Sequence, residues 1–171
     1  RVLDESGFDN HAILRGCKVV ALPNGKRAVQ LNGSSSSVHI AAQPSLNAWN
    51  ARRTWEILYS PGMDIPVSGI VYHALLAKHS SYGEGIYLAQ NSKPARIVFL
   101  QAGPKQSLEY PVKDSKGWYH IVGTYDGLEM KLYINGKLVG SRNTPIPPTV
   151  NSSPVSIGGG ATDANRCSPG I

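Results

Sequence analysis

The stretch Gly117–Ser141, with the sequence GWYHIVGTYDGLEMKLYINGKLVGS, predicts two β-strands and two tight turns. In its first half, residues 118, 120, 122 and 124 fall on one face of an extended strand, and residues 119, 121, 123 and 125 fall on the other. In its second half, apolar residues at 130, 132 and 134 recur with the same period of two. The dipeptides Asp126-Gly127 and Asn135-Gly136 follow these runs and suit turns that need a positive φ. Alternation and turns together predict a meander of antiparallel strands.

The rest of the chain has the same character. Short apolar or alternating runs are separated by Gly, Pro, Asn and Ser, and no segment keeps a helical period. We expect one helical turn within residues 43–53, and strands at residues 11–14, 17–21, 28–31, 38–40, 54–59, 70–78, 86–89, 96–100, 108–110 and 155–157. In the run 54–59, Trp55, Ile57 and Tyr59 share one face, and Glu56 lies on the other.

The segments WYHIVGTYDG and MKLYINGKLVG resemble the strand–turn–hairpin signature of laminin-G-like, concanavalin A-like jelly-roll domains, including the laminin G type 3-like and pentraxin-like groups. Three more parts of the chain resemble segments of the same family: Asp4–Gly7 with Asn10-His11, Ala28–Gly33 with Val38–Ile40, and Ser156–Gly159. The resemblance covers nearly the whole chain and implies an all-β, two-sheet antiparallel jelly-roll sandwich. This fold hosts lectins, adhesion modules, glycosidases and lyases, so the function has to come from particular residues.

The 171 residues are expected to form one laminin-G-like domain, residues 1–171. The chain begins at Arg1, which we interpret as the start of a piece of a larger protein. The resemblance implies that a first strand, before Asp4, and a last strand, after Ile171, are missing. Neighbouring segments or another chain would then complete a sheet edge.

The net charge of +6 has two interpretations. Lysines and arginines scattered through turns are typical of a solvated surface. Alternatively, the charge attracts an acidic polymer such as a sulfated or uronate glycan. Nucleic acid is disfavoured because there is no basic helix and no aromatic–basic strand motif. Membrane insertion is disfavoured because no 18 consecutive residues are apolar.

We expect a secreted or cell-surface location, where two features of the sequence would matter: its two cysteines and its two glycosylation patterns. Because the resemblance implies that the N- and C-terminal segments are neighbours, Cys17 and Cys167 are a candidate disulfide; the alternative is two buried thiols. Asn32 and Asn151 each begin an Asn-x-Ser pattern, which would accept a glycan in a eukaryotic secreted chain.

The N-terminal turn contains oxygen ligands suited to a hard cation. The resemblance implies a structural Ca²⁺ near the termini, with Asp4 and Asn10 as candidate ligands. The alternative is that these residues make ordinary turn and capping hydrogen bonds.

We expect no catalytic activity. A retaining glycosidase needs two carboxylates about 5–5.5 Å apart, and the glutamates here are isolated along the chain. The Gln-x-His pair of lyases on this fold is missing from the sequence, as are Gly-x-Ser-x-Gly and HExxH patterns.

Sugar binding requires aromatic faces and a few polar groups. The candidates are Tyr82, Tyr59, Glu56, Tyr87 and Trp49, whereas Trp118 is expected to be a core residue. Two hypotheses follow. The chain is a carbohydrate-binding or adhesive module that binds a glycan or an extracellular protein, or it is a structural module that packs against neighbouring domains of its parent chain or against other subunits.

Overall fold

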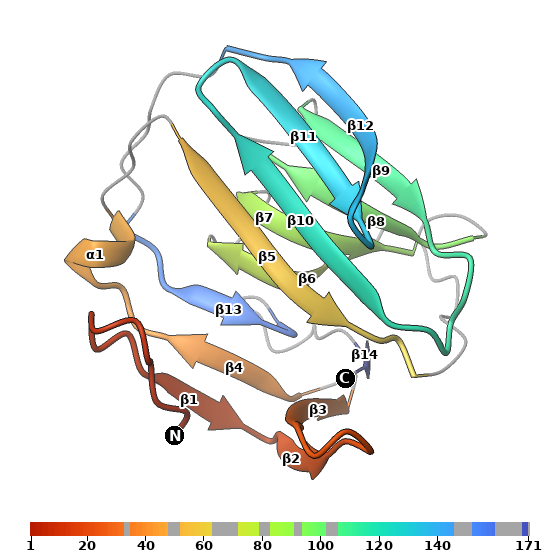
Figure 1. Cartoon of the computed structure of the whole chain (residues 1–171). Helices are drawn as coiled ribbons and strands as arrows, with labels where there is room; N and C mark the ends of the chain where they lie inside the picture. Colours follow the sequence, from red (N-terminus) through yellow and green to blue (C-terminus); the bar gives the residue numbers. More distant parts are fainter. Residues whose placement is uncertain are drawn as a thin grey trace.

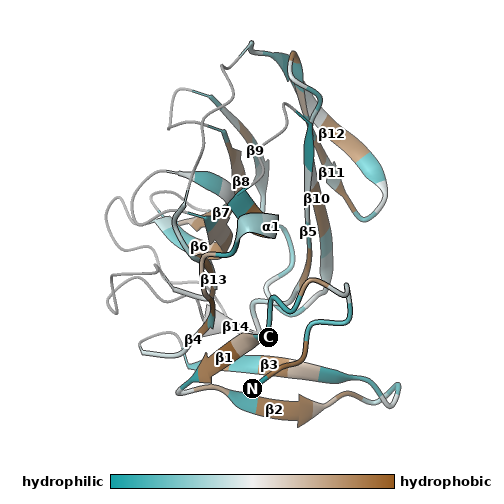
Figure 2. Cartoon of the chain, turned by 90° about the vertical axis from the view of Figure 1, so that its left-hand side faces the viewer, coloured by the Kyte–Doolittle hydropathy of each residue, from teal (hydrophilic) through white to brown (hydrophobic). Residues whose placement is uncertain are grey.

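The computed structural model describes residues 1–32, 35–47, 52–62, 72–78, 83–90, 94–101, 106–145, 152–159 and 169–170. Two antiparallel sheets face each other (Figures 1 and 2). The larger has the order β1-β4-β13-β6-β7-β8-β9 and consists of β1 (Ala12–Arg15), β4 (Ser37–Ile40), β13 (Val155–Ile157), β6 (Tyr72–Lys78), β7 (Glu84–Ala89), β8 (Arg96–Leu100) and β9 (Ser107–Pro111). The smaller has the order β12-β11-β10-β5 and consists of β12 (Lys137–Asn143), β11 (Glu129–Ile134), β10 (Tyr119–Tyr125) and β5 (Arg53–Tyr59). The predicted all-β, two-sheet antiparallel sandwich is therefore confirmed.

Two small elements lie beside the sandwich. The strands β2 (Lys18–Ala21), β3 (Arg27–Asn32) and β14 (Pro169–Gly170) form a third sheet in the order β14-β3-β2, at the bottom of Figure 2. The predicted helical turn is α1 (Pro44–Asn47). In the part of the chain that the structure describes, no helix has the length and apolar character needed to cross a membrane.

The meander predicted from residues 117–141 is present. Along β10, Tyr119, Ile121, Gly123 and Tyr125 are buried, and the residues between them are half-buried. β10 pairs with β11 on one side and with β5 on the other. At the β11–β12 turn, Asn135 and Gly136 have φ values of 51° and 77°, the pair of positive values that a two-residue type I′ turn requires.

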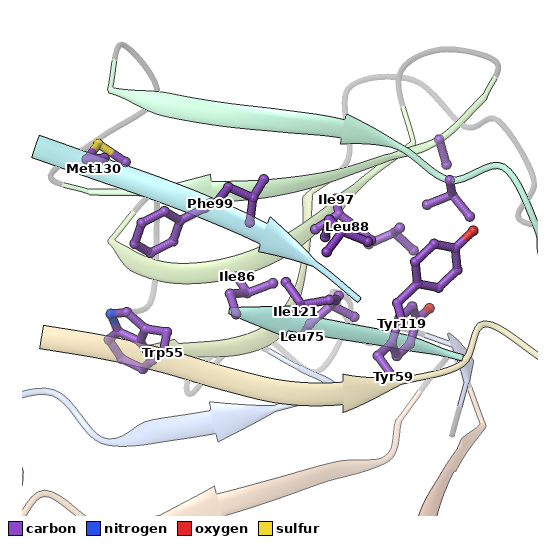
Figure 3. Close-up of a cluster of buried hydrophobic side chains, with 14 of the residues drawn as sticks. Trp55, Tyr59, Leu75, Ile86, Leu88, Ile97, Phe99, Tyr119, Ile121 and Met130 are labelled. Atoms are coloured by element: carbon purple, nitrogen blue, oxygen red, sulfur yellow. The ribbon is translucent and has the colours of Figure 1, made fainter. Parts of the chain in front are cut away.

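The main core fills the space between the two sheets. β5, β10 and β11 contribute one side, and β6, β7 and β8 contribute the other (Figure 3). Buried members include Trp55, Tyr59, Leu75, Ile86, Leu88, Ile97, Phe99, Tyr119, Ile121, Met130 and Leu132. Apolar side chains that alternate along each strand thus meet in one layer, which is the arrangement expected of a packed sandwich.

All six residues of β7 are buried, so this strand is covered on both faces. Ile86 and Leu88 join the core between the sheets, whereas Tyr87 and Ala89 belong to a second apolar cluster with Val98 and Leu100. Strands covered on both faces read as continuous apolar runs, and the run from Ile86 to Ala89 fits that rule.

Candidate functional site

A cleft of about 520 Å³ opens beside the N-terminal half of β5. Its walls come from β5, from α1, and from β4, β6 and β13 of the larger sheet. The lining includes polar side chains from Ser45, Arg53, Thr54, Glu56 and Lys78, and apolar ones from Ile40, Leu46, Trp55, Leu76 and Val155. This volume lies within the range of small-ligand pockets, about 300–1,000 Å³, and such pockets combine an apolar lining with a few polar groups.

Two buried cations, Arg53 and Lys78, are among the residues that line this cleft. Arg53 Nη2 lies 3.1 Å from Glu84 Oε1, and the two side chains are only 10% and 4% exposed. Arg53 Nε also donates a hydrogen bond of 2.7 Å to Gln101 Oε1. Burial lowers the pKa of Arg53, and the negative charge of Glu84 opposes that shift. These partners fix the guanidinium in place at the cleft wall.

Lys78 is the second buried cation, with 1% of its surface exposed. It lies opposite Glu84 in the β6–β7 register, and its Nζ donates a hydrogen bond of 2.8 Å to Asn47 Oδ1 on α1. Burial lowers the pKa of Lys78, while Glu84 opposes the change. One carboxylate therefore lies near two cations that come from the two sheets.

The short helix α1 is attached at both of its ends. Asn47 accepts the bond from Lys78, and the Ser45 hydroxyl donates to Asn10 Oδ1 at 2.9 Å. An isolated helix of four residues is not stable, so these tertiary bonds hold the wall of the cleft in position.

Glu56 stands at the outer rim of the cleft. Its Oε1 lies 2.7 Å from His120 Nε2 on the neighbouring strand, and the two side chains are 63% and 43% exposed. An exposed pair of this kind adds about 0–1 kcal/mol to stability. The carboxylate therefore has one side-chain partner in His120 and stays open to solvent.

The structure does not bring the predicted sugar-binding residues together. Glu56 lies at the cleft, but Tyr59 and Tyr87 are core residues with 3% and 6% of their surface exposed. Tyr87 also belongs to the cluster on the far face of β7. These two rings therefore present no face on which a sugar could stack. Tyr82 and Trp49 lie outside the described residues.

The prediction that Trp118 is a core residue is wrong. Its side chain is 39% exposed, because it precedes β10 and falls on the outer face with His120 and Val122, while Tyr119 on the opposite face lies in the core.

The Asp4–Asn10 turn has the geometry of a capped loop. Asp4 accepts hydrogen bonds from the Ser6 amide at 3.0 Å, the Ser6 hydroxyl at 2.6 Å and the Asn10 amide at 2.9 Å. These bonds lower the pKa of Asp4. Both carboxylate oxygens thus already accept bonds, and Asn10 Oδ1 accepts one from Ser45, which fits the capping alternative better than a cation site. Among the described residues, no three His, Cys, Asp or Glu side chains gather as a metal-binding set. Calcium stays a prediction.

The disulfide and glycosylation predictions are also open. The Cys17 Sγ lies 3.2 Å from the carbonyl oxygen of Arg15 and 3.1 Å from that of Ser37, and these two acceptors share its single proton. Cys167 lies outside the described residues. Asn32 Oδ1 accepts bonds from the amides of Ser35 and Ser36, so its side chain closes a turn. Asn151 is outside the described residues.

Arg53 and Lys78 are site residues that the sequence analysis did not identify. Lys78 carries a usable signal, because a lysine ends the apolar run Ala74–Ala77. Arg53 carries none, since its partner Glu84 lies 31 residues away in the sequence.

Comparisons with known proteins agree with this architecture. The family model Laminin_G_3, described as the concanavalin A-like lectin/glucanases superfamily, matches residues 32–170. No curated protein matches the chain.

Solved structures share the fold at low identity. The binding domain of Paraclostridial Mosquitocidal Protein 1 has a TM-score of 0.70 and 16% identity, over 98% of this chain and 44% of that one. The binding domain of botulinum neurotoxin DC in complex with SialylT has a TM-score of 0.65 and 17% identity, over 91% and 39%. Domain 4 of AbnA, a GH43 extracellular arabinanase from Geobacillus stearothermophilus, in complex with arabinotriose, has a TM-score of 0.66 and 15% identity, over 99% and 82%. The chain therefore spans less than half the length of either toxin domain.

Proposed function

Because the chain belongs to the concanavalin A-like lectin/glucanase superfamily, we propose that it is a non-catalytic carbohydrate-binding module of a larger secreted or cell-surface protein. The cleft beside β5 holds the glycan. The observation that carries this proposal is the convergence of Arg53, Thr54, Glu56 and Ser45 on one cleft of about 520 Å³.

The chemistry of the cleft suits a sugar. Thr54 and Ser45 supply hydroxyl groups, Glu56 supplies a carboxylate acceptor, and the half-buried Ile40 and Leu46 supply apolar surface for the C–H faces of the ring. Two relatives in fold add support: their structures contain SialylT and arabinotriose.

The arrangement of carboxylates supports a binding role over a catalytic one. Glycoside hydrolysis needs an acid and a second carboxylate on opposite sides of one bond. Among the described residues that line the cleft, Glu56 is the acidic one, and Glu84 is held by Arg53 with 4% of its side chain exposed.

The test is a glycan array followed by calorimetry on the best ligand. Thr54→Arg places a long side chain in the cleft and should weaken binding at least ten-fold. Thr124→Arg is the matched control, because Thr124 pairs directly with Thr54 on the next strand and does not line the cleft. The control should bind like the wild type.

Two outcomes would reject the proposal. One is a blank array for the folded protein in both calcium and chelator, accompanied by self-association in sedimentation, which would favour the assembly alternative. The other is a Thr54→Arg variant that binds its glycan as well as Thr124→Arg does. Release of reducing ends from the bound glycan would instead reject the non-catalytic role.

A further inference from the structure

A second hollow, of about 250 Å³, opens at the other end of β5. Residues 53–56 of this strand line the cleft described above, whereas residues 57–59 line the hollow. Its other walls come from the β2–β3 hairpin, from Trp118 and from Ile157 of β13. In Figure 1 the β2–β3 hairpin lies below the C-terminal end of β5.

The lining of the hollow is almost wholly apolar. Its uncharged members are Leu22, Ala28, Val29, Leu31, Ile57, Leu58, Tyr59, Leu75, Trp118 and Ile157. Leu75 and Tyr59 are buried, whereas Leu58 and Trp118 are 56% and 39% exposed. Large apolar side chains at the rim of an apolar hollow mark a binding surface, because an apolar ligand that covers them removes both its own surface and theirs from water.

The two remaining lining residues, Lys26 and Arg27, are cations. The tight hairpin turn fixes their backbone, since Leu22 N donates to Lys26 O at 2.7 Å and Lys26 N donates to Asn24 Oδ1 at 3.0 Å. Both side chains are exposed, and the described residues that line the hollow include no acidic one. Within the described ranges, neither side chain takes part in a salt bridge.

We propose that this hollow binds a small amphipathic anion. A hydrocarbon or aromatic body occupies the space between Trp118, Leu58 and Leu75, and a carboxylate or sulfate head lies against Lys26 and Arg27. The volume exceeds the cavity of about 150 Å³ that holds benzene, so an aromatic ring or a short alkyl chain fits.

The same lining argues against two other ligand classes. A sugar needs acceptors and donors around its ring, and the hollow offers apolar walls and two cations. An amphipathic cation would meet like charges at the rim. This inference does not depend on the glycan proposal, because the described lining residues of the two sites are entirely different.

The experiment is a titration monitored by tryptophan fluorescence and calorimetry, with octyl sulfate and octyltrimethylammonium as matched probes below their micelle concentrations. Octyl sulfate should bind at least ten-fold more tightly than the cation. Trp118→Ala should weaken its binding at least five-fold, with an unchanged circular dichroism spectrum and melting temperature showing that the variant folds.

A pair of double variants tests the charged rim. Lys26→Gln/Arg27→Gln should weaken octyl sulfate binding at least five-fold. Lys137→Gln/Arg142→Gln removes the same charge from exposed positions on β12 and should bind like the wild type. Equal affinity for the two probes, no binding of octyl sulfate, or equal affinity of the two double variants would overturn the proposal. Glycan binding should be the same in Trp118→Ala and the wild type, which keeps the two sites distinguishable.

Discussion

Arg53 on β5 and Glu84 on β7 form an ion pair of 3.1 Å that joins the two sheets of the sandwich. The guanidinium also lies over the Tyr125 ring, 5.2 Å from its centroid. A buried ion pair adds little net stability over apolar residues, but removing one partner leaves the other charge buried without compensation. The buried ion pair at the wall of the candidate cleft is therefore expected to be required for the stability of the fold.

Glu84→Gln should destabilise the protein by about 3–5 kcal/mol, because Arg53 and Lys78 would remain buried without the nearby carboxylate. Urea unfolding measures the change. Glu109→Gln is the control: its partner Arg96 is 2.6 Å away, but both side chains are about one third exposed, at 34% and 33%. That substitution should cost about 0–1 kcal/mol. Equal losses in the two variants would show that burial does not govern the Arg53–Glu84 pair.

Gly123→Ala should cost about 1–3 kcal/mol by overpacking the core. A Cβ at this position on β10 would lie 2.5 Å from Phe99 Cδ2 on β8, and Phe99 is fully buried. Gly140→Ala is the matched control on β12, where the nearest atom would be Leu108 Cδ2 at 3.4 Å. Urea unfolding of Gly123→Ala, Phe99→Leu and the double variant completes the test. If Gly123 clashes with Phe99, the double variant should lose less stability than the sum of the two single losses. A double variant whose loss equals or exceeds that sum would argue against the clash.

Much of the fold was predictable because burial repeats locally along each strand. Trp55 and Tyr59 alternate with exposed Thr54 and Glu56, as expected for a strand with one face in the core. Strand order was not predictable from the residues alone. It depends on pairings between distant segments, such as β13 with β4 and β6.

The site was less predictable because it is assembled from distant elements. Lys78 and Asn47 meet across 31 residues, and Ser45 and Asn10 meet across 35. Tyr59 and Tyr87 were named as candidate sugar-binding rings but are buried, since residue type alone does not tell which face of a strand is covered. Trp118 was misplaced because its residue type favoured the core, whereas the alternation puts it on the face opposite the buried Tyr119.

Stability should fall above about pH 10, because burial raises the pKa of Tyr59 and Tyr87 above the usual value of 10.0. In the unfolded chain these phenols ionise near pH 10, while the native ones stay protonated. The native state then binds more protons, so its stability is complete below that pH and decreases as pH rises towards the folded values. Lys78, with a lowered pKa, contributes the opposite slope below its ordinary value of 10.5.

Urea unfolding at pH 8 to 11 isolates the tyrosine contribution. Tyr59→Phe should reduce the slope of stability against pH by at most about 1.4 kcal/mol per pH unit. Tyr133→Phe, on the half-buried outer face of β11, is the comparison. Identical slopes in the wild type and Tyr59→Phe would contradict the assignment.

Asp126→Ala should lower the melting temperature at pH 7, because Asp126 Oδ1 accepts hydrogen bonds from the amides of Leu128 at 2.9 Å and Glu129 at 2.8 Å. Those two bonds, the one from Glu129 first, lower the pKa of Asp126. A carboxylate with a lowered folded pKa stabilises the native state above its unfolded pKa, near 3.8, and loses that effect as pH falls through the folded value. The difference between wild type and Asp126→Ala should therefore shrink in acid, as followed by calorimetry from pH 7 to pH 2. Glu5→Ala removes the same charge from an exposed position in the N-terminal turn and should leave the melting temperature nearly unchanged. A difference that persists undiminished at pH 2 would contradict a role for the ionised carboxylate in the turn.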